Sequence, residues 1–314
     1  MLAAGAGSRL AYAALMSTQP GGEKLWTRSN HRGEPVSLLE GPAVTAAAAS
    51  SALIVPGLDG RLRLALGLAG VGAGAVGCYD DLTGGSDRHG FRGHLGALAR
   101  GEVTTGAVKI AGIGATGLAA ALLLDRPDDG RGTVPGQEAS ASSRIADLAI
   151  NGALVAGAAN LLNLFDLRPG RAIKVGLLAS LALGLGGGEA VAAAAAPAGA
   201  AVALLPEDLG ERAMLGDSGA NALGAMLGVA AAASLPRPAR IAVLGVVAGL
   251  TAASENVSFT KVIARTPALN WLDMLGRRPA RAAAGEFGFQ REGEAPHAGG
   301  GMQAAAATGD PRSR

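Results

Sequence analysis

The sequence predicts an all-α, polytopic integral membrane protein, and three observations predict it. The chain has 314 residues, of which 49% are hydrophobic and 17% are charged, whereas soluble domains carry about 25% charged residues. Its mean hydropathy is positive, at +0.31. Apolar stretches recur at lengths near the roughly 20 residues that a helix needs to cross a bilayer, and their number suggests about 8–10 transmembrane helices.

Eight apolar stretches are expected to form helices, and each is dominated by small residues. They lie at 42–56, 62–79, 106–124, 146–165, 172–187, 190–205, 219–235 and 238–253. Ala and Gly let membrane helices approach closely. The alternative is a soluble bundle of Ala-rich helices, but the stretches show no polar stripe that would face water.

The two ends of the chain differ from this pattern. Residues 1–16 are apolar but too short to span a bilayer, and we expect an incomplete first helix there. Residues 279–314 are rich in Gly, Ala and charge without apolar periodicity, which is typical of a disordered tail. The expected organisation is therefore a membrane domain over 1–278 followed by a disordered cytoplasmic tail over 279–314.

Basic residues predict the orientation of the helices. If the chain leaves the first partial helix on the cytoplasmic side, the segments on that side hold 16 Lys and Arg residues and the opposite segments hold 7. Cytoplasmic loops carry an excess of Lys and Arg. We therefore expect a multi-pass protein of the cell membrane, with the loops around Arg92, Arg168 and Lys261 in the cytoplasm and the loop around Arg131 outside.

This topology brings the polar residues of the apolar segments to one face of the membrane. The cytoplasmic helix ends carry Asp80, Asp81, Asn160, Asn163, Asp166 and Asp217. Ionisable residues at such positions are costly and are candidates for function. Several carboxylates at one site suit Mg²⁺, which prefers oxygen ligands and shares them with substrate phosphates. Nearby Lys and Arg suit phosphate oxygens.

Other patterns support weaker alternatives. The stretch GAGAVG at 72–77 satisfies GxGxxG, but a dinucleotide fold requires a preceding strand and a following helix. The four histidines, at 31, 89, 94 and 297, lack the spacing of a zinc site. Asp80 and Asp81 alone could be solvated boundary acids, and Asp217 alone could be a helix N-cap. Cys78 is the only cysteine, so no internal disulfide can form.

Three stretches in order, GCYDDLTG, NLLNLFD and MLGDSGANALGAMLG, resemble the signature motifs of the polyprenyl-phosphate N-acetylhexosamine-1-phosphate transferases. This family includes phospho-N-acetylmuramoyl-pentapeptide transferase and N-acetylglucosamine-1-phosphate transferases. The resemblance covers residues 29–273 and implies a helical fold and a Mg²⁺-dependent cytoplasmic site. It also implies transfer of a sugar-1-phosphate from a nucleotide sugar, usually UDP-linked, to polyprenyl phosphate for cell-wall or surface glycan assembly.

The resemblance also implies roles for individual residues. Asp217 matches the Mg²⁺-binding acid, and Asp80 and Asp81 match the pair near the lipid phosphate, one of which acts as base or orients the acceptor. Asp81 is taken as a second metal ligand. Substrate contacts are expected from Asn160, Asn163, Asp166, Lys109, Arg92, His94 and Lys261. For Lys109, Arg92 and His94 a basic collar is the alternative. Nucleic acid is not an expected partner, and a homodimer remains open.

The chain departs from the family pattern after Asp166. The second acid of the family, associated with the nucleotide base, is replaced by Pro169, and Arg171 follows. We therefore expect weaker discrimination for uridine, with Arg171 adding a cation to the pocket. Gly84 stands where some members have a third acid, and a histidine-rich stretch is missing from TPALNWLDMLGR. The alternatives are an inactive paralogue that binds lipid phosphate or nucleotide sugar, and a membrane transporter.

Overall fold

The structure is a computed structural model that describes residues 1–83, 104–125 and 140–279. The chain divides into two units, Met1–Arg278 and Pro279–Arg314. The predicted tail lies outside the described residues from position 280 onward. Most described residues of the first unit are helical, and the only sheet in this part of the chain is a two-stranded hairpin. The prediction of an all-α fold is confirmed.

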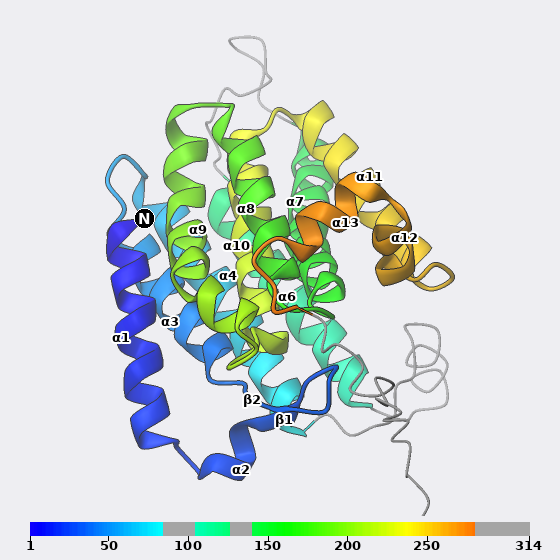
Figure 1. Cartoon of the computed structure of the whole chain (residues 1–314). Helices are drawn as coiled ribbons and strands as arrows, with labels where there is room; N and C mark the ends of the chain where they lie inside the picture. Colours follow the sequence, from blue (N-terminus) through cyan, green and yellow to red (C-terminus); the bar gives the residue numbers. More distant parts are fainter. Residues whose placement is uncertain (84–103, 126–139, 280–314) are drawn as a thin grey trace, which may run out of the picture. The chain divides into compact units, whose positions relative to one another are not determined.

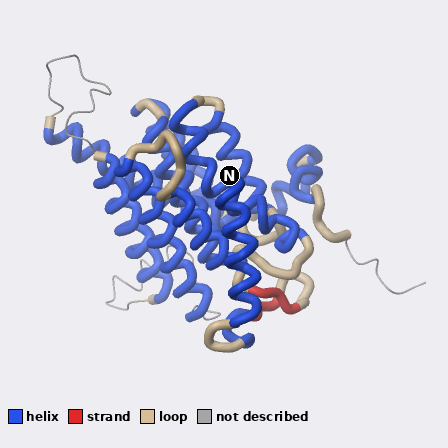
Figure 2. The backbone as a smooth tube through the Cα atoms, turned by 90° about the vertical axis from the view of Figure 1, so that its left-hand side faces the viewer, coloured by secondary structure: helices blue, strands red, loops and turns tan. Residues whose placement is uncertain are grey.

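The helices of the first unit pack side by side with alternating direction (Figures 1 and 2). Nine of those that the structure describes have more than ten residues: α1 (Leu2–Thr18), α3 (Glu40–Ala52), α4 (Gly60–Thr83), α6 (Thr105–Leu124), α7 (Ala141–Phe165), α8 (Arg171–Gly184), α9 (Gly188–Leu209), α10 (Gly216–Ser234) and α11 (Arg237–Ser254). Three are shorter: α2 (Glu23–Trp26), α12 (Phe259–Arg265) and α13 (Pro267–Met274). Each of the eight predicted apolar stretches coincides with one of the helices from α3 to α11.

The number of helices that can cross a membrane unaided is lower than expected. Within the described residues, α4, α6, α7 and α9 are long and apolar enough to do so, and α11 with α12 makes a fifth candidate that is bent by 99°. The helices α3 and α8 have 13 and 14 residues, which is less than the roughly 17 needed to span. The polytopic membrane class is thus confirmed, with four or five candidate spans among the described residues where 8–10 were predicted.

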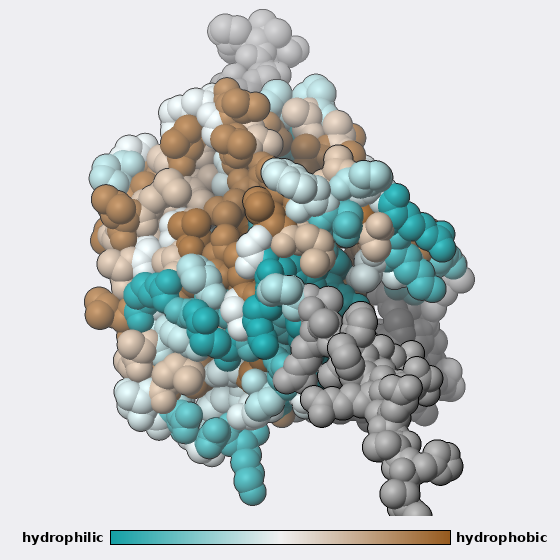
Figure 3. Space-filling view, viewed as in Figure 1, coloured by the Kyte–Doolittle hydropathy of each residue, from teal (hydrophilic) through white to brown (hydrophobic). Residues whose placement is uncertain are grey.

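The outer surface of the helices suits lipid. Large apolar side chains are exposed on the second half of α8 and directly after it, including Leu178, Leu181 and Leu185. On the face drawn in Figure 3, hydrophobic residues gather over α8 and α9, and hydrophilic residues lie below them. In water such a patch would be unfavourable, whereas a bilayer removes this cost.

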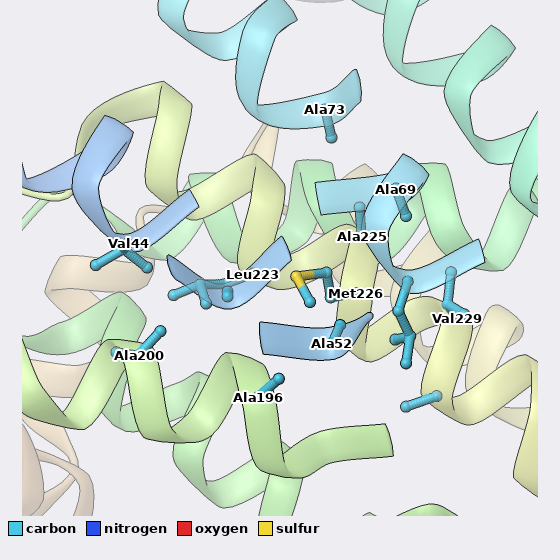
Figure 4. Close-up of a cluster of buried hydrophobic side chains, with 14 of the residues drawn as sticks. Val44, Ala52, Ala69, Ala73, Ala196, Ala200, Leu223, Ala225, Met226 and Val229 are labelled. Atoms are coloured by element: carbon cyan, nitrogen blue, oxygen red, sulfur yellow. The ribbon is translucent and has the colours of Figure 1, made fainter. Parts of the chain in front are cut away.

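The helix α10 forms the centre of the first unit and contacts α3, α4, α7, α8 and α9. All but three of its 19 residues are buried. Figure 4 shows part of this core, in which Met226 and Leu223 of α10 lie among alanines of the neighbouring helices. Glycines allow the close approach: a Cβ on Gly77 of α4 would collide with the backbone carbonyl of Asp217, and one on Gly224 with that of Ala158.

A small hairpin holds the segment that leads into α10. Strand β1 (Thr27–Ser29) pairs antiparallel with β2 (Pro35–Ser37), with Arg28 opposite Val36. Ser37 then exchanges backbone hydrogen bonds with the chain before α10, donating to Arg212 at 3.2 Å and accepting from Met214 at 2.9 Å. The start of α10 is therefore fixed from outside the bundle as well as from within it.

Candidate functional site

Four helix termini meet at one end of the first unit, which we call the site end. There α4 and α7 finish, and α6 and α10 begin. This places Asp80 and Asp81 in the last turn of α4 and Lys109 in the first turns of α6. It also places Asp166 directly after α7 and Asp217 in the first turn of α10. The predicted convergence of the three motifs at one end of the helices is therefore present in the fold.

Lys109 joins two of the carboxylates. Its Nζ lies 2.9 Å from Oδ2 of Asp80 and also contacts Oδ2 of Asp217. The three side chains are 17–28% exposed, so the cluster is mostly shielded but still reaches solvent. One ammonium thus serves two carboxylates from different helices, which leaves excess negative charge at this point.

Asp81 has a different role from its neighbour. Its Oδ1 accepts the backbone N–H of Asp217 at 3.0 Å, and its Oδ2 accepts that of Ser218 at 2.9 Å. These are N–H groups of the first turn of a helix, which lack intrahelical partners. Asp81 therefore caps α10 from the end of α4, an arrangement that the sequence analysis did not anticipate.

Gly216 makes room for this cap. Its φ is +61°, in the left-handed region that favours glycine, and a Cβ there would lie 3.0 Å from Oδ2 of Asp81. The N-cap position of α10 is Leu215, whose own side chain forms no capping hydrogen bond. The alternative that Asp217 is itself the N-cap is therefore wrong. Its carboxylate points instead toward Lys109.

Asp166 completes the group of acids around the start of α10. It follows α7, and its carboxylate lies against the backbone N–H of Gly216. Burial, together with the nearby charges of Asp208, Asp217 and Asp81, raises the pKa of Asp166 well above its ordinary value. Burial is the larger cause of this shift, and the three neighbouring carboxylates add to it.

The donor set fits a hard cation, although no complete metal cluster is formed by the protein alone. Within the described ranges, no group of three or more His, Cys, Asp or Glu side chains has the geometry of a metal site. Asp80 and Asp217 nevertheless direct oxygens at one shared cation, the Lys109 ammonium. Carboxylate oxygens are what Mg²⁺ prefers, and it usually keeps waters and substrate phosphates as further ligands.

Other predicted substrate residues lie around this cluster or outside it. Asn160 and Asn163 lie on the last turns of α7 and are partly buried, without a side-chain hydrogen bond among the described residues. Lys261 lies on α12, is exposed, and makes no ion pair in the described part of the chain. Arg92 and His94 lie outside the described residues, as do the loop around Arg131 and the acid-free position Gly84.

Arg171 does not add a free cation to the pocket. It is 4% exposed, and its Nε and Nη2 donate to the two carboxylate oxygens of Asp273 at 2.7 and 3.1 Å. Its Nη1 donates to Thr260 at 3.0 Å. Burial opposes ionisation, but the hydrogen bonds and charge of Arg171 prevail and lower the pKa of Asp273. The guanidinium charge is thus neutralised within the protein, which corrects the expectation from the sequence.

Several functional candidates were missed by sequence reasoning. Glu40 is 0% exposed, and neither of its oxygens has a hydrogen-bond partner among the described residues. Asp208 is also buried. Arg28 donates to the backbone carbonyl of Asp81, which links the hairpin to the site. The only signal for Glu40 was an acid at the start of the apolar run EGPAVTAAAA, and nothing in the sequence marked Arg28.

No model of a known protein family matches the sequence, and no curated protein is significantly similar to it. The case for a function therefore depends on the motifs and on the geometry of the site.

Proposed function

We propose that this protein is a membrane phospho-sugar transferase. It transfers a sugar-1-phosphate, of N-acetylhexosamine type, from a nucleotide sugar to polyprenyl phosphate at the cytoplasmic face of the cell membrane. The products are a polyprenyl-diphosphate sugar, used for cell-wall or surface glycan assembly, and a nucleoside monophosphate. The observation that carries the proposal is the contact of one ammonium, Lys109, with Asp80 and Asp217 at the start of α10.

The site has the components that phosphoryl transfer requires. Catalysis of this reaction depends mainly on positioning and on neutralising charge on the phosphates. The N-terminus of α10 favours anions through its N–H groups and its dipole. Lys109 supplies a positive charge, and the carboxylates supply ligands for a cation. The apolar helices beside the site keep the lipid acceptor in the membrane.

In the proposed reaction, an oxygen of the lipid phosphate attacks the phosphorus that carries the sugar. The bond from this phosphorus to the bridging oxygen breaks, and the nucleoside monophosphate leaves with that oxygen. When the acceptor phosphate carries a proton, Asp80 accepts it. Lys109 exchanges its contact with the carboxylates for phosphate oxygens. Mg²⁺ held by Asp217 and Asp80 would supply further neutralisation of the diphosphate charge.

Asp81 is assigned a positioning role in this proposal, in place of the metal ligand expected from the sequence. Both its oxygens accept backbone N–H groups of α10, and this contact holds Asp217 at a fixed distance from the end of α4. Asp80 is therefore the better candidate for the second metal ligand. Its oxygen shares the Lys109 ammonium with Asp217.

A binding protein without turnover is the second candidate, and the residues after Asp166 favour it. Pro169 cannot supply an acid for the nucleotide base, and Arg171 is committed to Asp273. Both candidates predict binding of nucleotide sugar or lipid phosphate. Only the transferase forms product.

Product formation is therefore the test. Purified protein in detergent is incubated with Mg²⁺, polyprenyl phosphate and a panel of UDP-, CDP- and GDP-sugars. The transferase predicts nucleoside monophosphate release that requires both the lipid phosphate and Mg²⁺. Binding of a nucleotide sugar without any release, under conditions where a known transferase is active, would favour the binding protein.

A further inference from the structure

The helix α13 buries its acid and exposes its apolar side chains, which is the reverse of a helix on a water-exposed surface. Its acid, Asp273, is 8% exposed, whereas Trp271 is 67% exposed, Leu269 45% and Met274 44%. A surface helix in water presents its polar face outward and buries its apolar face. The exposed apolar side of α13 therefore fits an apolar environment outside the protein.

An ion pair fixes this orientation. Asp273 accepts two hydrogen bonds from Arg171 at the start of α8 and a third from Arg277 at 2.7 Å. Lys174 donates to the carbonyls of Leu272, Asp273 and Leu275 at 3.0, 2.8 and 2.7 Å. Cations near the last carbonyls of a helix satisfy them and complement its dipole. We call these contacts to α8 the α8–α13 latch.

The position of α13 along the chain suits a membrane boundary. It follows α11 and α12, which qualify as a membrane span only together and meet at a bend of 99°. The latch holds it against the first turn of α8 (Figure 1). The bend turns the chain away from the axis of α11 before α13 begins. Trp is enriched at this depth because its ring is apolar and its N–H is polar.

The charge of the segment favours a lipid surface over a protein partner. Between residues 257 and 279 the only acid is Asp273, which is buried in the latch. Lys261 and Arg265 on α12 are exposed. Basic and apolar residues together, without an exposed acid, complement the anionic headgroups of a cytoplasmic leaflet. An open groove of about 550 Å³ beside Trp271, lined by Pro267, Asn270, Met274, Leu275 and Gly276, has room for part of an acyl chain.

We propose that α13 is an interfacial membrane anchor, inserted by its Trp271 face between the headgroups and the upper acyl chains and held in that orientation by the Arg171–Asp273 pair. The inference does not depend on the proposed transferase activity. It gives Arg171 a role in orienting the C-terminal segment on the membrane.

Tryptophan fluorescence in proteoliposomes tests the anchor. The chain has two tryptophans, and Trp26 is buried against Pro20, so a Trp26→Phe variant reports on Trp271 alone. Subtracting the spectrum of Trp271→Phe from that of the natural chain gives the same signal without altering Trp26. The vesicles contain phosphatidylglycerol and lipids brominated either near the headgroup or near the chain end.

The anchor predicts that shallow bromines quench Trp271 about twofold more than deep bromines, and that aqueous acrylamide quenches it weakly. Asp273→Asn should reduce the shallow quenching and increase the acrylamide quenching, because the latch is lost. Arg278→Gln, which removes the exposed pair with Glu34, should leave both unchanged. Strong acrylamide quenching in the natural chain, or resistance to both quenchers, would overturn the proposal, since the face would then meet water or protein.

Discussion

Asp81 and Ser218 are joined by a hydrogen bond of 2.9 Å that caps the start of α10 with the end of α4. The same carboxylate accepts the N–H of Asp217 at 3.0 Å. The cap therefore connects the YDD and GDSG motifs, which are 136 residues apart, through backbone groups. Neighbouring acids of one motif thus make different contacts: Asp81 holds the start of α10, and Asp80 pairs with Lys109.

Replacing Asp81 should lower stability. Asp81→Ala leaves two partly buried N–H groups of α10 without an acceptor, at a cost of about 1–3 kcal/mol, whereas Asp81→Asn keeps one acceptor oxygen and should lose about half of that. The measurement is the apparent melting temperature in detergent at one scan rate. Asp80→Asn is the matched control, and its melting temperature should stay close to that of the natural chain. Equal shifts at positions 80 and 81 would contradict the cap.

Gly77 should not tolerate a side chain. A Cβ there meets the backbone carbonyl of Asp217, and since backbone cannot move aside, Gly77→Ala should push α4 away from α10 and cost about 1–3 kcal/mol. Gly114→Ala in α6 is the control, because nothing lies within 4 Å of its Cβ. Removing that glycine from a helix should be neutral or stabilising by about 0.5–1 kcal/mol. If both variants melt alike, the helices are not packed at Gly77 as described.

Much of this fold could be predicted from the apolar runs and from the polar residues that the topology brings to one face of the membrane. Each run became a helix because burial in lipid or in the core is the largest favourable contribution to the folding of such segments. The acids of the three motifs converge because successive helices run in alternating directions, which brings the ends of α4 and α7 to the start of α10. The Arg171–Asp273 pair could not be predicted, because its residues are 102 positions apart and no local pattern marks a pair. The capping role of Asp81 was hidden for the same reason.

The sequence predicted more membrane-spanning helices than the described residues contain, for a related reason. The runs at 42–56 and 172–187 resemble spans in the sequence, but their helices, α3 and α8, are short. Hydropathy marks the ends of such helices poorly, because Ala and Gly contribute little to it. The two helices are stabilised by packing against longer neighbours, which no window of sequence reports. The length of a helix in a bundle is set partly by its neighbours.

The orientation of the bundle can be tested across one helix. Ser142 lies in the first turn of α7, a candidate span, and Leu167 lies two residues after its end; both are exposed. In a Cys78→Ser background we expect Ser142→Cys to react with a membrane-impermeant maleimide in intact cells. Leu167→Cys should react only after the membrane is opened. The reverse pattern would put the carboxylates on the outer face and remove the nucleotide sugar from reach.

Lys109 should matter both for cation binding and for transfer. Lys109→Met removes the ammonium that neutralises Asp80 and Asp217, so the two carboxylates should bind a divalent cation more tightly, by about tenfold. Nucleoside monophosphate release should nevertheless fall by about 10²-fold or more, because the phosphates lose a positive contact. Paramagnetic resonance of Mn²⁺ measures the first effect. Lys24→Met, at an exposed lysine, is the control and should change neither value.

Asp217 tests the central claim, that the start of α10 is a phosphoryl-transfer site, most directly. Asp217→Asn keeps the size and polarity of the side chain and leaves the Asp81 cap in place, since that cap uses the backbone of residue 217. The measurement is release of nucleoside monophosphate from nucleotide sugar and polyprenyl phosphate, by the natural chain and by the variant, across a range of Mg²⁺ concentrations. We expect release by the natural chain and none by a variant that melts normally, a loss of several kcal/mol of transition-state stabilisation. Activity of the variant within about threefold of the natural chain would contradict the account.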